Sequence, residues 1–524
     1  MKQLTFIMLL LAVMQIGRAQ VAGTPYIGYS PSSTNTMGKD FWLTFTNIDG
    51  LLSTNTSIMT SKGSAAAVDF LLNITTDLPN TVTVSFTADS TGTPLAPRSF
   101  TYNLAAKENR RIRLDSMRSD GNTGAWFDER LNAYLGQNTD NTAITNNLSI
   151  QVTSAQPISL NAFAGYNQFV DATCIYPVPT WGTDYYNISY GVATFPMKNV
   201  IIANSNGTDI YLNNATTPAA TLNAGQVYQV GFGGVSDITG YHVTTSKPAA
   251  FFVDNGGVTI VQPAQEQLYE QMAPVNVWDK RYFVPNATQF SSASTSSSNN
   301  RIRVVASQDN TQVNYAGATT VNGASGPGAS TSPNINQIAS GGTLNAGQFV
   351  QLLINNRDSG VYIIANNPIG VAGYLVGGGT ATPMGTNIDG DPDQAVIPGL
   401  NQLVQQVTFA PFIFPSQPPL SFTVFDNVLG YHSAVIVTPT ANKGTVIMTK
   451  GTAQTNLLTG TWIDDANGSG MSTYRYVFDN VNDLGSSFTV KSLAAGTGVF
   501  VLCYGLALDE SYFYNAGSAL NTLQ

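Results

Sequence analysis

The sequence predicts an all-β protein assembled from about four repeated antiparallel β units. Apolar and polar residues alternate with a period of two through most of the chain, as in 208–212 and 433–437, and these segments are rich in β-branched and aromatic residues. Similar segments recur in the same order along the chain. Helical periodicity is limited to two short stretches, 129–134 and 265–272, which are the only helix candidates.

The first 19 residues have the features of an export signal. Lys2 precedes an apolar run over 5–14, and Gly17 and Ala19 supply the small residues of a signal peptidase site. The run is shorter than the roughly 20 apolar residues of a membrane-spanning helix. We therefore expect cleavage after Ala19, export, and no direct insertion of the mature chain into a membrane.

The clearest internal repeat is a segment of ten residues. TLNAGQVYQV at 221–230 returns as TLNAGQFVQL at 343–352. The segments before the two copies, 199–212 and 301–315, also correspond. A match of this length with corresponding neighbours indicates repeated structural units.

A second repeat consists of a strand, a polar turn and another apolar strand, and it occurs four times. Pro157, Pro248 and Pro368 hold the same place in three copies, whereas the copy at 488–505 has no proline there. Proline lacks an N–H and fixes φ, which suits the start of a strand after a turn. We expect the same local structure in the three copies that contain it.

These repeats divide the mature chain into four β units. Each is long enough for five or six strands, whereas the blades of familiar propeller repeats have about 40 to 45 residues. We therefore expect linked sandwich-like modules, with a propeller-like ring as the alternative. The predicted units are 36–181, 182–277, 278–402 and 403–517.

The repeated segments together resemble the N-terminal domain of IgGFc-binding protein and its bacterial secreted relatives. The resemblance implies an extracellular binding or adhesion protein, and it carries over no catalytic residues and no particular ligand. The Cys-rich modules that accompany the domain in the mucus protein are absent from this chain. The segments that carry the resemblance are GKDFWLTF (38–45), VTSAQPISLNAFAG (152–165), PVPTWGTDYY (177–186), VTTSKPAAFFVDNG (243–256), APVNVWDKRYFV (273–284), RIRVVASQDNTQV (301–313), both TLNAGQ copies, and YGLALDESYFYNAG (504–517).

Composition excludes several classes of function. The formal net charge is −9, only 10% of residues are charged, and Lys and Arg form no stripe, so we expect neither a nucleic acid nor an anionic membrane as partner. An apolar fraction of 43% excludes general disorder. The surface is expected to be solvated by hydroxyl and amide groups.

The sequence contains no established catalytic motif, and we predict that the protein is not an enzyme. His242 and His432 are its only histidines, both in strand-like contexts, which supplies neither a hydrolytic triad nor a multi-histidine zinc site. Glu266, Glu270 and Asp254 could be imagined as the paired carboxyl groups of a glycosidase. No motif supports that pairing.

One acidic turn is a candidate calcium site, and no other cofactor is expected. Asp389, Asp391 and Asp393 alternate in NIDGDPDQ, which offers oxygen ligands of the kind that calcium prefers. The distal bidentate Glu of an EF-hand is missing, so a solvated loop tip is the alternative.

Cys174 and Cys503 are the only cysteines. Export would permit a disulfide between them. Two buried free thiols, behaving as small apolar side chains, are the alternative.

Two tryptophans are candidate ligand-binding residues. Trp126 and Trp462 lie in Gly/Asp/Asn-rich segments outside the repeats, where an aromatic ring can anchor an interface. Trp42, Trp181 and Trp278 lie near the starts of repeated strands, so we expect them in the core.

The favoured function is extracellular recognition or adhesion without chemistry. The partner would be an extracellular protein, a glycan or a cell surface, bound through loops such as the Ser/Gly-rich 291–300 and 317–342. The alternative is a structural component of a surface layer, sheath or biofilm matrix, which would self-associate through strand edges. A carbohydrate-active hydrolase is the least favoured hypothesis.

Overall fold

The computed structural model describes residues 35–46, 68–86, 98–114, 143–166, 169–191, 197–233, 237–260, 265–287, 300–321, 332–354, 360–376, 390–413, 431–453, 456–507 and 510–522. Within these ranges the chain is almost entirely antiparallel β-sheet, which confirms the predicted all-β fold of repeated units. The 3₁₀ helices there are η2 (Val178–Thr180), η3 (Val275–Val277) and η5 (Thr440–Thr445). No helix in the described part is both long and apolar enough to cross a membrane.

The first sheet has seven strands, and the long strand β7 (Ile150–Tyr166) is its hub. The first half of β7 pairs with β1 and β3, and its second half pairs with β2 and β8. The register against β1 shifts just before Ile158, so that Pro157 lies in a bulge at the middle of the hub. The other strands are β1 (Gly38–Leu43), β2 (Val68–Thr76), β3 (Asn80–Phe86), β4 (Arg98–Leu104), β5 (Asn109–Arg113) and β8 (Phe169–Cys174).

The second sheet has eight strands and repeats this pattern around β14 (His242–Val258). Its first half pairs with β9 and β11, and its second half pairs with β10 and β15. The bulge recurs, since the register against β9 shifts between Thr244 and Ala249. The other strands are β6 (Ala143–Asn146), β9 (Gly182–Tyr186), β10 (Met197–Ala203), β11 (Thr208–Leu212), β12 (Ala220–Leu222), β13 (Val227–Phe232) and β15 (Glu266–Gln271).

The third sheet, also of eight strands, is built around β22 (Val361–Val376). Its first half pairs with β16 and β18, and its second half pairs with β17 and β23. The register against β16 shifts between the partners Ile364 and Ile369, around Pro368. The other strands are β16 (Asp279–Val284), β17 (Arg301–Ala306), β18 (Thr311–Ala316), β19 (Ala318–Thr320), β20 (Gly342–Leu344), β21 (Phe349–Ile354) and β23 (Pro392–Val396).

The fourth unit has the same pairings but two separate sheets. Its hub is broken into β30 (Phe488–Ser492), in a four-stranded sheet, and β31 (Phe500–Ala507), in a five-stranded sheet. β30 pairs with β24 and β26, and β31 pairs with β25 and β32. The other strands are β24 (Gln406–Phe409), β25 (Tyr431–Pro439), β26 (Val446–Lys450), β27 (Asn456–Leu457), β28 (Trp462–Asp464), β29 (Met471–Val477) and β32 (Glu510–Gly517).

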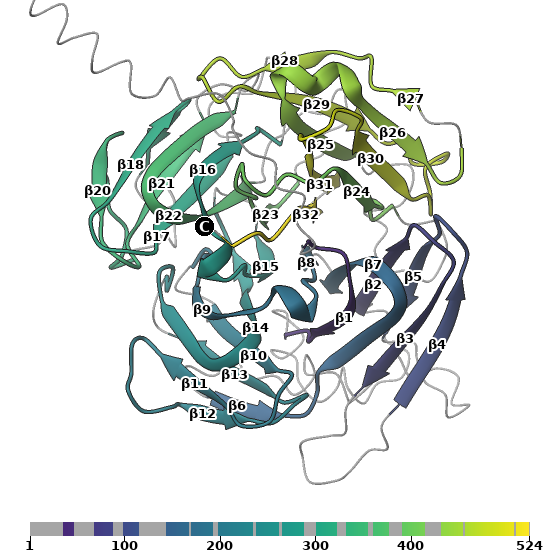
Figure 1. The fold of residues 1–524 in the computed structure, drawn as a ribbon. Helices are drawn as coiled ribbons and strands as arrows, with labels where there is room; N and C mark the ends of the chain where they lie inside the picture. The colour runs from purple at the N-terminus through teal and green to yellow at the C-terminus, as the bar shows by residue number, and fades with distance from the viewer. Residues whose placement is uncertain are drawn as a thin grey trace, which may run out of the picture.

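The sheets surround a common centre (Figure 1), where the innermost strand of each unit lies. These inner strands contact one another in a closed circle, β8 on β15, β15 on β23, β23 on β32, and β32 on β8. The two ends of the described chain meet at the last of these seams, where the Thr36 N–H donates to the Ser518 carbonyl at 2.9 Å and Asn35 forms a β-bridge with Ala519. The sandwich-like curl of each unit and the ring, which the sequence offered as alternatives, therefore occur together.

Apolar side chains fill the seams between neighbouring units. One cluster joins the first sheet to Val200, Phe252 and Tyr269 of the second, and another joins the fourth unit to Leu71 and Phe163 of the first. Two further clusters join the second unit to the third and the third to the fourth. Burial of apolar area, the main stabilising contribution to folding, therefore also holds the units together.

The ten-residue repeat forms the same turn twice. The Asn223 N–H donates to Gln226 Oε1 at 2.7 Å, and the Asn345 N–H donates to Gln348 Oε1 at 2.8 Å. Both copies have glycine as the third residue of the turn. Gly225 has φ of 81° and Gly347 has φ of 76°, a backbone conformation that favours glycine.

Two segments differ from expectation. The helix candidate 265–272 is wrong, because Glu266–Gln271 is β15, and contacts with the neighbouring inner strands outweigh its weak local preference for a helix. The predicted loop 317–342 contains β19 and the start of β20, and its Ile335 bridges to Phe349. The described parts of this stretch therefore pair in the sheet, although its Gly/Ser/Asn composition is typical of loops.

Candidate functional site

Several residues singled out from the sequence lie outside the described residues. These are Trp126, Asp389, the helix candidate 129–134 and most of the 291–300 insertion. The structure places Trp462, Asp391, Asp393, Cys174 and Cys503. Trp462 lies on β28 of the fourth unit, whereas Asp393 lies on the inner strand β23 of the third.

Trp462 is half-buried on the edge strand β28 of the fourth unit. Its ring packs against Tyr474 on β29, with centroids 5.3 Å apart, and its indole N–H donates to the Leu458 carbonyl at 3.2 Å. Tyr476, two residues further along β29, is also half-buried. The three aromatic side chains flank the apolar cluster between the two sheets of this unit and remain partly open to solvent.

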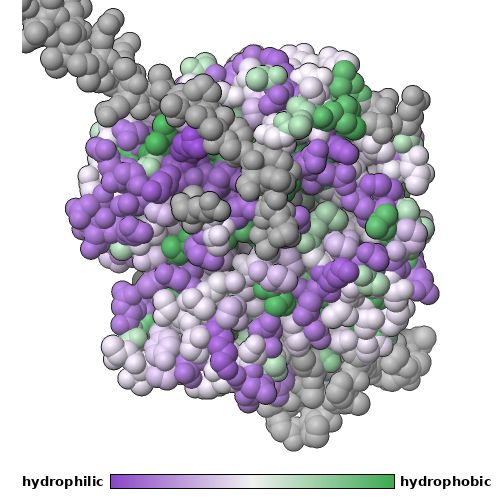
Figure 2. All heavy atoms as spheres, in the orientation of Figure 1, coloured by the Kyte–Doolittle hydropathy of each residue, from purple (hydrophilic) through white to green (hydrophobic). Residues whose placement is uncertain are grey.

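The fourth unit also exposes more large apolar side chains than the rest of the described chain. The exposed ones are Leu78 at 54%, Leu457 at 47%, Val477 at 50%, Val481 at 72% and Leu493 at 57%, and all but Leu78 belong to this unit. Figure 2 shows an apolar patch over it at the top right of the view. Exposed apolar side chains around aromatic rings are typical of binding surfaces. We call Trp462, Tyr474 and Tyr476 the aromatic patch.

The two described members of the acidic turn are buried. Asp391 and Asp393 are 4% and 0% exposed, and Asp393 belongs to the inner strand β23 rather than to a loop tip. The Gln394 N–H donates to Asp393 Oδ1 at 2.5 Å. No group of three or more His, Cys, Asp or Glu side chains in the described residues is arranged to hold a metal ion.

The three acidic residues considered for glycoside hydrolysis are also fully buried. Asp254 forms an ion pair with Lys198 at 2.7 Å and accepts a hydrogen bond from the Gln267 side chain at 2.8 Å. Glu266 Oε1 accepts the N–H of Val170 at 2.6 Å. These carboxyl groups are engaged inside the protein, not held at an open cleft.

Carboxyl groups instead connect the inner strands. The inner strands belong to different sheets, so the N–H groups on their facing edges need acceptors other than a β-ladder. At three of the four seams a carboxylate supplies one. Asp171 on β8 accepts from the Tyr269 N–H on β15 at 2.5 Å, Glu270 on β15 accepts from the Val396 N–H on β23 at 3.0 Å, and Asp393 on β23 accepts from the Phe513 N–H on β32.

The pKa of all three carboxyl groups is raised by burial, although the hydrogen bonds from backbone N–H groups lower it in part. Burial raises the pKa of Asp171 well above its usual value, and the charge of Asp393 raises it further. Burial likewise raises the pKa of Asp393 and of Glu270, and each is raised further by a neighbouring carboxylate. The centre of the ring therefore favours protonated carboxyl groups.

Both cysteines are free and buried. Burial raises the pKa of the Cys503 thiol to about 12 and raises that of Cys174 as well, so neither is a reactive thiolate. His432 is buried against the Tyr512 hydroxyl at 2.9 Å, and burial lowers its pKa to about 3, so it is neutral.

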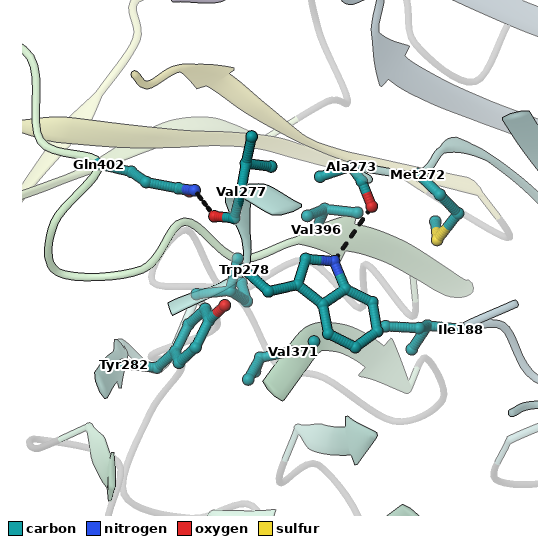
Figure 3. A pocket seen from close by; sticks show the side chains of 11 residues that line it. Ile188, Met272, Ala273, Val277, Trp278, Tyr282, Val371, Val396 and Gln402 are labelled. Atoms are coloured by element: carbon teal, nitrogen blue, oxygen red, sulfur yellow. Dashed lines mark hydrogen bonds between the residues drawn. The ribbon is translucent and has the colours of Figure 1, made fainter. Parts of the chain in front are cut away.

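A cavity of about 20 Å³ lies at the seam between the second and third units, beside Trp278. Figure 3 shows the Trp278 indole N–H donating to the Ala273 carbonyl and the Gln402 side chain donating to the Val277 carbonyl. The Trp181 indole makes the equivalent bond to Tyr176 one unit earlier. This volume accommodates about one water molecule, so the cavity belongs to the packing of a repeated corner.

Sequence reasoning missed the buried Arg303, which joins the second and third units. It pairs with Asp237 at 2.8 Å and lies 3.9 Å above the Tyr190 ring. A faint signal was present, because Arg301 and Arg303 alternate in an otherwise apolar strand segment. Its partner is 66 positions away in the printed sequence, and no local pattern identifies it.

One comparison with known proteins gives a match. The sequence profile of the family described as IgGFc binding protein matches residues 31–235 and 171–505 of the chain. No curated protein matches the chain significantly.

Proposed function

The chain belongs to the IgGFc-binding family, and we propose that it is a secreted recognition protein that binds an extracellular protein or glycan without carrying out chemistry. Membership of this family suggests that the protein binds an extracellular partner. The burial of its central carboxyl groups supports the proposal that it carries out no chemistry.

One observation carries the proposal. Three carboxyl groups at the centre are fully buried and accept hydrogen bonds from backbone N–H groups of neighbouring strands: those of Asp171, Glu270 and Asp393. A general acid or base must reach a substrate atom within hydrogen-bonding distance. These groups are instead part of the scaffold.

The aromatic patch is the surface we propose for the ligand. Trp462 and Tyr474 offer ring faces that are rigid, because each ring is held by the other at 5.3 Å. Rigid aromatic side chains lose little conformational entropy on binding and anchor protein and sugar ligands. The segments with Trp126 and 291–300 remain further candidates for the same role.

Binding is tested with immobilised full-length mature protein on a biosensor. The probes are a purified IgG Fc fragment, the Fab fragment of the same antibody, and a mucin-type glycoprotein before and after enzymatic removal of its glycans. Saturable binding of Fc but not Fab supports protein recognition, and binding lost with the glycans supports sugar recognition. If no probe binds above a heat-denatured control, while the chain self-associates with concentration in light scattering, recognition is wrong and the structural alternative stands.

A further inference from the structure

The centre of the ring contains two carboxyl groups that contact each other directly. Asp171 on β8 and Asp393 on β23 belong to the inner strands of the first and third units, and their side chains are hydrogen-bonded to each other. Both are 0% exposed. In the circle of inner strands, β8 and β23 are separated by β15 on one side and β32 on the other, so the contact crosses the centre.

Two ionised carboxylates cannot make this contact. Asp171 accepts the N–H groups of Ala172 at 2.6 Å and Tyr269 at 2.5 Å, and Asp393 Oδ1 accepts that of Gln394 at 2.5 Å. The Phe513 N–H also acts on Asp393, but the remaining oxygen, Asp393 Oδ2, is buried and accepts no N–H or O–H of the described residues when both groups are ionised. A proton on one of the two groups supplies the missing donor.

We propose that a proton shared between Asp171 and Asp393 fastens the first and third units across the centre, and that its loss loosens the ring. The resulting bond is an O–H···O⁻ hydrogen bond in a dry, buried place, where a charged acceptor strengthens it. The contact thereby acts as a pH-sensitive fastening, independent of any ligand.

No cationic side chain among the described residues is found to act on the pair. The groups that act most strongly on Asp171 and Asp393 are each other and Glu270 on β15. Cys174 on β8 and Tyr269 on β15 are the other titratable groups close by, while β32 presents the Phe513 N–H. Further along β15, Glu266 accepts the N–H of Val170. A bridging divalent cation would need six or more oxygen ligands, and three of the four oxygens of the pair already accept backbone N–H groups.

The direction of the pH effect follows from linkage. The pKa of the pair is raised in the folded ring, so between the ordinary carboxyl pKa and the raised one the folded state holds one more proton than the unfolded chain. The stabilisation is fully present below the ordinary pKa and is lost as the pH rises through the raised one. In this window each rise of one pH unit increases the unfolding equilibrium constant by about tenfold, because the folded state holds one more proton than the unfolded chain.

Asp393→Asn tests the proposal, because an amide supplies a permanent N–H to Asp171 and its oxygen still accepts the Gln394 N–H. Unfolding of the full mature chain is followed in urea at intervals from pH 5 to pH 9. The ratio of the wild-type unfolding constant to that of the variant should rise by up to about tenfold per pH unit until the wild-type pair loses its proton. Asp209→Asn, at a half-buried carboxylate away from the centre that accepts from Thr221, is the control and should follow the wild type.

Two further readouts keep the test decisive. Wild-type protein at neutral pH should show a protonated-carboxyl C=O infrared band that decreases in Asp393→Asn, and this can be measured whatever the stability of the variant. Adding calcium should leave the wild-type melting temperature unchanged. Parallel pH profiles with no change in the infrared band would overturn the shared proton, as would a calcium-dependent rise in melting temperature that Asp393→Asn abolishes, since a cation would then occupy the centre.

Discussion

The first three units and the fourth use the same strand pairings but differ in their hub strand. In the first three, one strand of 17, 17 or 16 residues runs through the sheet, with Pro157, Pro248 or Pro368 at its central bulge. In the fourth, which has no proline there, β30 ends at Ser492 and β31 begins at Phe500. The first three sheets are continuous, and the fourth is divided into two.

The tryptophan corner precedes the second and third units, whereas the first and the fourth lack it. Trp181 and Trp278 end the 3₁₀ turns before β9 and β16, and each indole donates to a carbonyl five residues earlier. The segment before β24, 397–405, contains no tryptophan. The unit that lacks these two features is also the one with the aromatic patch and most of the exposed apolar side chains. The first three units therefore contribute mainly to the scaffold, whereas the fourth carries most of the exposed apolar surface.

The largest expected effect compares a corner tryptophan with the patch tryptophan. Trp278 is 4% exposed, so Trp278→Ala should lower the free energy of unfolding by about 3 to 5 kcal/mol, through lost burial and an enlarged cavity. Trp462 is half-buried, and Trp462→Ala should cost only about 1 kcal/mol. Urea unfolding monitored by circular dichroism measures both. Equal losses would contradict the division between scaffold and surface.

A pair of glycines tests the seams in the same way. Gly240 has φ of +87°, and an added Cβ would lie 1.8 Å from the Gly347 carbonyl oxygen of the third unit. Gly240→Ala should therefore destabilise the protein by about 2 to 4 kcal/mol, because strain and a backbone clash combine. Gly470 in the fourth unit has φ of +71° with nothing within 4 Å of the added atom. Gly470→Ala should cost only the conformational penalty, about 1 kcal/mol, and a larger loss than for Gly240→Ala would refute this reading of the seam.

The smallest expected effect concerns the hub bulge. Pro248→Ala should destabilise the protein by about 0.4 to 1 kcal/mol, since it increases the conformational freedom of the unfolded chain without removing a folded-state contact. The shift in the thermal midpoint measures it. A loss of several kcal/mol would show that the proline holds the two halves of the strand together, and unchanged stability would remove it from the explanation.

The sequence predicted those parts of the fold that depend on local pattern. Alternating residues gave the strands, and the TLNAGQ copies and the prolines gave the repeats, because turns and bulges are specified by nearby side chains. It mispredicted 265–272 as helical, since β15 is specified by the neighbouring inner strands and not by its own residues.

The candidate site could be predicted less well, for the same physical reason. The alternating Asp391 and Asp393 suggested a calcium turn, but the sequence does not show that Asp393 faces Asp171 from a different unit. The context of Trp462 made it a candidate ligand residue, which stays a prediction, whereas its neighbour Tyr474 was not proposed, because the two meet only through strand pairing. Contacts between distant segments are what a local pattern leaves out.

The central claim, that the aromatic patch binds and the buried carboxyl groups support the scaffold, is tested most directly by the affinity of Trp462→Ala. The measurement is an equilibrium biosensor titration with whichever of the Fc fragment or glycoprotein binds the wild type, on protein whose melting temperature is recorded in parallel. The account predicts a loss of about 1 to 3 kcal/mol of binding free energy, with Asp393→Asn binding like the wild type. Wild-type affinity in Trp462→Ala together with lost affinity in a folded Asp393→Asn would contradict it.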